Sequence, residues 1–183
     1  MASLLDFQAR YEKRLKGELK RPEGVSPEFW AEYQEDLEQV LLHLLLLLFI
    51  AAATQQGAPV GEATLLASQY AAGRSAQVAS GYVADSRQMA DDFRSRSPAD
   101  STSPTKGEID EVSDKILGES RTERLAVTET TAAAVTGMEA VVARMIGLSE
   151  DDTWFTRSDS RVCPICEPLH GTKRSRWGRL FPE

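Results

Sequence analysis

The sequence is poor in the residues on which most enzymes and disulfide-rich domains depend. Its 183 residues include only 2 cysteines and 2 histidines. It contains no Gly-rich phosphate loop, no Ser-His-Asp order and no pair of carboxylates with an evident pocket. We therefore do not expect an enzyme. The cysteines form one Cys-x-x-Cys without a preceding secretory signal, which predicts a reducing compartment.

Positive charge is also scarce, because the formal net charge is −7. An acidic balance argues against a DNA-binding field over the whole surface. Basic residues gather at the two ends of the chain, as Arg10, Lys13, Arg14, Lys16, Lys20 and Arg21, and as Arg157, Arg161, Lys173, Arg174, Arg176 and Arg179. Such ends suit contact with an acidic partner or with phosphates, although a solvated charged face is the simpler interpretation.

The spacing of apolar residues predicts a mainly α fold of several long helices, followed by a small β-containing Cys-x-x-Cys module. We divide the chain into an N-terminal helical region (1–94), a linker (95–107), a second helical region (108–147) and the C-terminal module (148–183). The linker has two prolines, several serines and no apolar side chain larger than Ala. In the module, 154–156 and 177–181 are expected to form short strands.

Helix starts are indicated by capping residues. Ser26 followed by Pro27 is typical of an N-cap and first helical position. Thr105 with Glu108, and Ser120 with Glu123, have the spacing of capping boxes. The stretch from 62 to about 93 is rich in Ala, Ser and Gly, so it is expected to pack closely against the Leu-rich helix before it.

That Leu-rich helix contains an apolar run from Val40 to Ala53. At about 1.5 Å per residue the run reaches only about 21 Å, which is short of the roughly 30 Å bilayer core. We therefore expect a buried central helix, or one packed against another subunit, and no membrane span. His43 is expected in the core or an interface, because no second metal ligand stands at a suitable spacing beside it.

Cys163 and Cys166 have three interpretations that the residues leave open. The first and favoured one is zinc, since two thiolates at this spacing can grip one ion through a turn, with His170 as a third ligand. The second is a redox disulfide, although the expected βαβ context is not evident. In the third, both are simply small buried residues.

A longer pattern surrounds these cysteines. An Arg-rich helix start, an Ala-x-Thr-Glu and a helix of small residues precede a Trp-x-Thr-x-x-Asp-x-Arg-x-Cys-x-x-Cys-x-x-Leu-x-Gly string. Its residues are Arg121, Ala126, Thr128, Glu129, Trp154, Thr156, Asp159, Arg161, Cys163, Cys166, Leu169 and Gly171. Over about the last third of the chain, the sequence resembles the phage Mu F-like head morphogenesis proteins, which are minor head proteins of tailed phages.

The resemblance implies a minor capsid protein that acts in head morphogenesis and in DNA packaging or delivery. Expected partners are the portal protein and the major capsid or scaffold protein, with DNA and self-association as further candidates. It also implies a location in the phage head interior or at the portal vertex, after assembly in the host cytoplasm. The family pattern continues with a Phe-Pro segment and a His-Pro-x-Cys-Arg-Cys run, whereas this sequence ends at Glu183. We therefore expect a cut or shortened member that lacks half of a four-ligand site.

The motif's polar residues are expected to be structural rather than catalytic. Glu129, with Arg121 about two turns earlier, suggests a carboxylate held by an arginine that fixes the helix against Trp154. Asp159 and Arg161 are expected to brace the turn by hydrogen bonds, and Thr128 belongs to the same partner or structural set. The rival hypothesis is a small zinc-binding interaction module whose apolar helix docks on a membrane or a partner.

Overall fold

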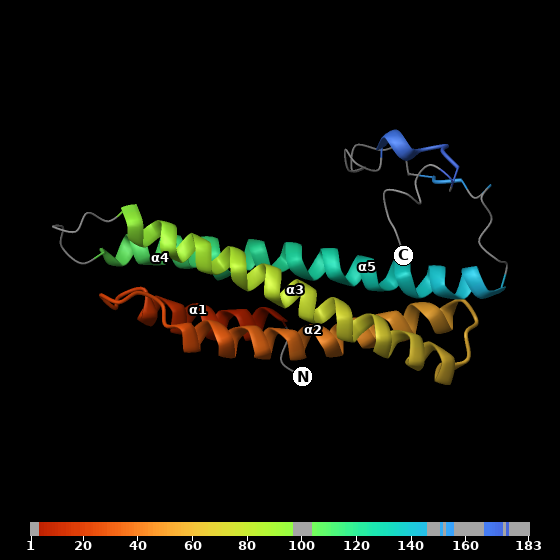
Figure 1. The fold of residues 1–183 in the computed structure, drawn as a ribbon, viewed down its shortest axis with the longest axis horizontal. Coiled ribbons are helices and arrows are strands. Elements are labelled where there is room, and N and C mark those ends of the chain that lie inside the picture. Colours follow the sequence, from red (N-terminus) through yellow and green to blue (C-terminus); the bar gives the residue numbers. More distant parts are fainter. Residues whose placement is uncertain are drawn as a thin grey trace. The chain divides into compact units, whose positions relative to one another are not determined.

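The computed structural model describes residues 4–96, 104–145, 151, 153–155, 167–173 and 175. The chain divides into two compact units, Met1–Glu139 and Ala140–Glu183. Its helices are α1 (Leu4–Glu18), α2 (Pro27–Gln55), α3 (Val60–Arg96), α4 (Lys106–Leu117) and α5 (Glu119–Met145), which continues into the second unit. The predicted mainly α fold is confirmed (Figure 1).

The prediction of a β-containing C-terminal module is wrong. Among the described residues there is no strand, only an isolated antiparallel bridge between Thr153 and Lys173 and a 3₁₀ turn at Glu167–Leu169. Gly171, with a φ of +72°, turns the chain two residues before Lys173, so the described pairing is limited to the one bridge between Thr153 and Lys173. The expected strand at 177–181 lies outside the described residues.

Helices α2 and α3 form a long antiparallel hairpin, which Figure 1 shows as the orange and yellow-green ribbons. Ser26 caps α2 by accepting a hydrogen bond from the Phe29 N–H, with Pro27 in the first turn, as the sequence predicted. Gly57 turns the chain between the helices with a φ of +93°, a conformation that favours glycine. The close packing expected of the Ala-rich helix is confirmed. In the first half of α3 the buried residues are all small, namely Ala63, Ala67, Ala71, Ser75 and Ala79.

An aromatic cluster joins α1 to the N-terminal half of α2. The rings of Tyr11 and Tyr33 lie 4.8 Å apart between centroids, and those of Phe7 and Tyr33 stack at 5.8 Å. Both tyrosine hydroxyls have buried or half-buried acceptors, because Tyr11 donates to Asp36 and Tyr33 donates to Gln8, each at 2.7 Å. Burial of these rings supplies much of the hydrophobic stabilisation at this end of the first unit.

The capping box of α4 is confirmed, because Thr105 and Glu108 bond each other's backbone N–H reciprocally. The second predicted box is wrong. Helix α5 already begins at Glu119, and the Thr122 N–H donates to the Gly118 carbonyl, so Ser120 lies inside the helix. Gly118 ends α4 and starts α5, which leaves no room for an extended cap at Ser120.

Candidate functional site

Arg121, the first residue of the family-like pattern, joins three helices. Its guanidinium donates to the Ile116 carbonyl of α4 at 3.0 Å and to the Tyr82 carbonyl of α3 at 3.5 Å. It also lies over the Tyr82 ring, 4.1 Å from the centroid. Cations are favoured near the carbonyl end of a helix and over aromatic rings. Arg121 therefore holds the start of α5 in place.

Glu129 is the most deeply buried charged residue among those described, with 3% of its surface exposed. Its two carboxylate oxygens accept hydrogen bonds from Arg74 Nε at 2.7 Å and Arg74 Nη2 at 2.8 Å. This contact raises the pKa of Arg74. The predicted pairing of Glu129 with Arg121 is wrong, because the arginine that holds this carboxylate is Arg74 of α3.

The sequence contained a signal for Arg74 that helical spacing within α5 could not use. No Lys or Arg stands between Arg21 and Arg74. That isolation makes Arg74 conspicuous, but it does not point to Glu129, which is 55 positions away. Thr128, the neighbour of Glu129 in the pattern, lies exposed.

In the second unit, the two segments that flank the cysteine pair are hydrogen-bonded to each other. Trp154 donates its N–H to the Thr172 carbonyl at 2.9 Å, and the Gly171 N–H donates to the Trp154 carbonyl at 2.7 Å. Leu169 is buried, and His170 is exposed with its ring edge-on to Phe155 at 5.7 Å. These hydrogen bonds bring Trp154 of the motif next to the segment that contains Leu169 and Gly171.

The proposed zinc ligands are not decided by this geometry. Cys163 and Cys166, together with Asp159 and Arg161, lie outside the described residues. Within the described ranges, no three His, Cys, Asp or Glu side chains gather in a way that could hold a metal ion. Because that search leaves out both cysteines, zinc at this position stays a prediction.

The apolar run of α2 is covered on one side only. Leu41, Leu45 and Phe49 are buried, whereas Leu47 is 52% exposed. His43 is exposed and lies one helical turn before Leu47, so it is not a core histidine. Its Nδ1 lies 2.7 Å from the Gln39 carbonyl oxygen. Helix α2 is long and apolar enough to cross a membrane, and 33% of its most apolar window is buried in the chain. Helix α2 is therefore only partly buried within the chain, and its packing against another subunit stays a prediction.

Comparison with known proteins adds no family assignment: no family model, no curated protein and no solved structure matches the chain.

Proposed function

We propose that this chain is a phage minor head protein that acts in head morphogenesis and in DNA packaging or delivery. It would bind the portal protein and the major capsid or scaffold protein, after assembly in the host cytoplasm. The ordered motif from Arg121 to Gly171 is the basis for the family. The role found for Arg121 and Glu129, which is to fix α5 on α3 and α4, is consistent with structural work rather than catalysis.

A binding function is supported above all by the half-covered α2. An apolar helix face left open in a folded chain is typical of a surface that a partner covers. Leu47, at 52% exposed, stands in that face. No lysine or arginine lies on α2 to contact phosphates, so the face suits a protein partner better than DNA. DNA contact, if it occurs, belongs to the basic ends of the chain.

The proposal includes zinc at the knuckle as a structural element. Thiolates of Cys163 and Cys166 with the imidazole of His170 form a donor set that zinc accepts, and the exposed His170 ring can be approached. The ion would stiffen the turn that Trp154 and Gly171 already hold together.

The test is a pull-down with the portal protein encoded in the same genome, followed by metal analysis of the eluted chain. Leu47→Gln removes apolar contact area from the open face and should weaken portal binding by about tenfold. Val127→Gln is the matched control, because Val127 is 66% exposed on another helix and should leave binding unchanged. Equal binding by both variants would remove α2 from the interface.

A second candidate is the membrane- or partner-docking zinc module, favoured by the length and apolar character of α2. Flotation with neutral phosphatidylcholine vesicles separates the two. A chain that floats with vesicles and ignores portal would support the second candidate. A chain that stays unbound to vesicles and is retained by portal would support the first.

A further inference from the structure

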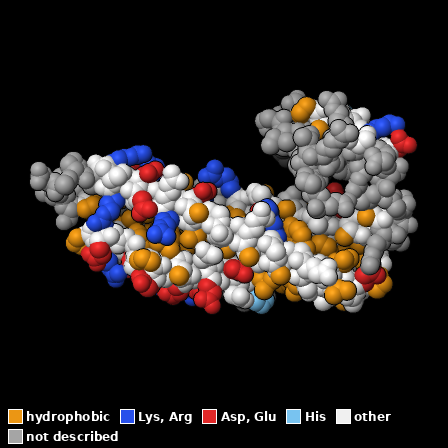
Figure 2. All heavy atoms as spheres, viewed as in Figure 1, with side chains coloured by type: hydrophobic (Ala, Val, Ile, Leu, Met, Phe, Trp, Pro, Cys, Tyr) orange, Lys and Arg blue, Asp and Glu red, His pale blue; other side chains and the backbone are white. Residues whose placement is uncertain are grey.

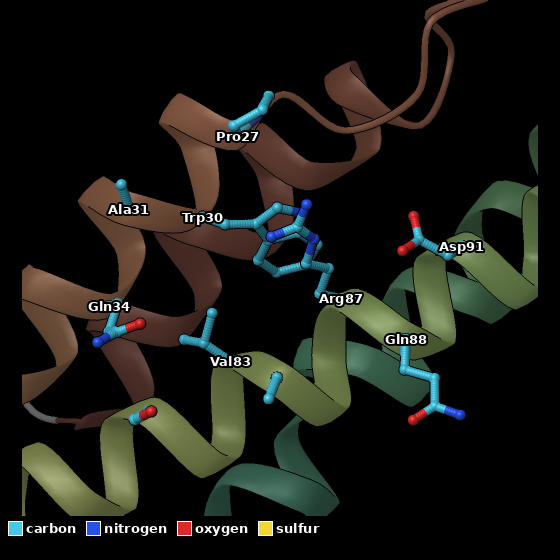
Figure 3. Close-up of a pocket in the computed structure, with 10 residues that line it drawn as sticks. Pro27, Trp30, Ala31, Gln34, Val83, Arg87, Gln88 and Asp91 are labelled. Atoms are coloured by element: carbon cyan, nitrogen blue, oxygen red, sulfur yellow. The ribbon is translucent and has the colours of Figure 1, made fainter.

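A groove runs along the opposite part of the α2–α3 hairpin, near the start of α2. Its larger section has a volume of about 520 Å³ and lies between Pro27–Gln34 of α2 and Ser80–Asp91 of α3. Figure 3 shows Trp30 and Val83 between the two helices, where they form a narrow apolar floor with only 4% and 5% of their surfaces exposed. A second section of about 310 Å³ continues along α2 to Gln39, and both sections share Ala31 and Gln34. Together they form one groove, long enough for a few turns of a helix.

The acidic side chains of the groove's rim lie mainly in its second section. Glu35 and Glu38 line that section on α2, whereas the section beside Trp30 has Asp91 against the single cation Arg87. Within the part of the chain that the structure describes, none of these four makes an ion pair. By contrast, the acids on the α1 side of α2 are engaged, since Glu32 pairs with Arg14 at 2.7 Å and Asp36 with Arg10 at 3.6 Å.

Charge decides which occupant fits. The absence of Lys and Arg between Arg21 and Arg74 leaves α2 with no cation of its own beside Glu35 and Glu38. Nucleic acid and anionic membranes would therefore be repelled by this rim. An apolar floor with an acidic rim is complementary to a helix that has apolar residues on one face and Lys or Arg beside them.

We infer that this groove binds a basic amphipathic helix of a partner protein. The partner's apolar side chains would lie over Trp30 and Val83, while its basic side chains would face Glu35, Glu38 and Asp91. The groove does not include the exposed Leu47. The inference does not depend on whether the partner is a phage head protein.

The test uses the full chain and a fluorescently labelled, capped peptide of Leu, Lys and Ala, patterned as an amphipathic helix about 18 residues long. Anisotropy should show binding that weakens as salt is added. Glu35→Gln/Glu38→Gln/Asp91→Asn should bind about tenfold more weakly at low salt, because three rim charges are lost. Ala31→Arg, a change at an exposed position on the groove wall, should also weaken binding.

The matched control is Asp85→Asn/Asp92→Asn/Glu123→Gln, which changes the net charge equally at exposed positions outside the groove. It should bind like the original chain. A peptide with Glu in place of Lys should not bind. An equal loss of peptide binding in both triple variants would show only a general charge effect and would overturn the proposed site. Dimers of the chain that dissociate with Ala31→Arg, without peptide binding, would make a second copy the occupant and overturn the inference as well.

Discussion

The Arg74–Glu129 pair shows how one residue contact fixes two helices. Glu129 sits in the small-residue part of α5, and its side chain is 4% exposed, whereas that of Arg74 is 33% exposed. A carboxylate so deeply placed needs a partner, because burying an unpaired charge is costly. The two hydrogen bonds from one guanidinium also set the direction in which α5 meets α3.

Arg74→Ala should therefore lower the free energy of unfolding by about 3 kcal/mol, since it leaves a buried carboxylate unpaired. Urea unfolding followed by circular dichroism measures this change without the ionic screening of guanidinium. Arg87→Ala is the control on the same helix, because Arg87 is exposed and forms no ion pair with another described residue, so its loss should matter little. The double variant Arg74→Leu/Glu129→Leu should lose less than Arg74→Ala alone. If Arg74→Ala matches Arg87→Ala, the pair contributes nothing to stability.

At the scale of the elements, one glycine sets how closely α5 approaches α2. A Cβ built on Gly137 would lie 2.7 Å from the Phe49 carbonyl oxygen and 3.3 Å from its Cα. Both neighbours are backbone atoms, which cannot turn aside. Gly73 and Gly81 of α3 are different, because a Cβ on either would meet nothing within 4 Å. The close α2–α3 contact is made by alanines and Ser75 instead.

Gly137→Ala should destabilise the chain by about 1–3 kcal/mol, because the added methyl group forces α5 away from α2. Gly73→Ala and Gly81→Ala should instead stabilise it by up to about 1 kcal/mol, since alanine favours helix and has open space there. Thermal and urea unfolding of the three variants test both signs together. Stabilisation by Gly137→Ala would show that α5 does not approach α2 as described.

Local sequence signals predicted the helices well and the contacts between helices poorly. The caps at Ser26 and Thr105 could be predicted because each depends on residues three positions apart. The pairing of Glu129 with Arg74 could not, since the two are 55 positions apart and only the packed helices bring them together. The acidic groove was missed for the same reason, because its walls come from two helices. The prediction of a β-module failed for the described residues, where the turn at Gly171 leaves only one bridge, between Thr153 and Lys173.

At the scale of the whole molecule, charge and apolar surface are unevenly distributed in the first unit. The ion pairs gather around α1, as with Arg14–Glu32 and Lys16–Asp110. The apolar run of α2 from Val40 to Ala53 contains no Asp, Glu, Lys or Arg. Figure 2 shows hydrophobic side chains, drawn in orange, exposed at several places on the visible face.

The same packing buries Tyr11, Tyr33 and Tyr82 and partly covers Tyr70. Burial is the main cause that raises the pKa of Tyr11, Tyr33, Tyr70 and Tyr82, and in Tyr11 the Asp36 carboxylate raises it further. The sequence has only 4 tyrosines, so the tyrosine signal reports on this core alone. The folded pKa values lie above those of the unfolded chain. Their contribution to stability is therefore fully present below about pH 10 and is lost as the pH rises toward the folded values.

We therefore expect tyrosinate absorbance at 295 nm to appear only well above pH 10, together with the loss of the helical circular dichroism signal. Above about pH 10, unfolding free energy should fall by about 1.4 kcal/mol per pH unit for each tyrosine that stays protonated in the fold. The chain unfolded in guanidinium chloride should titrate near pH 10 and serves as the reference. Tyr70→Phe should reduce the amplitude of the absorbance change by one tyrosine, and the remaining tyrosines should still titrate well above pH 10. Tyrosinate forming near pH 10 in a chain with intact helical signal would mean that water reaches these rings, and the packing of α1, α2 and α3 around them would have to be looser than described.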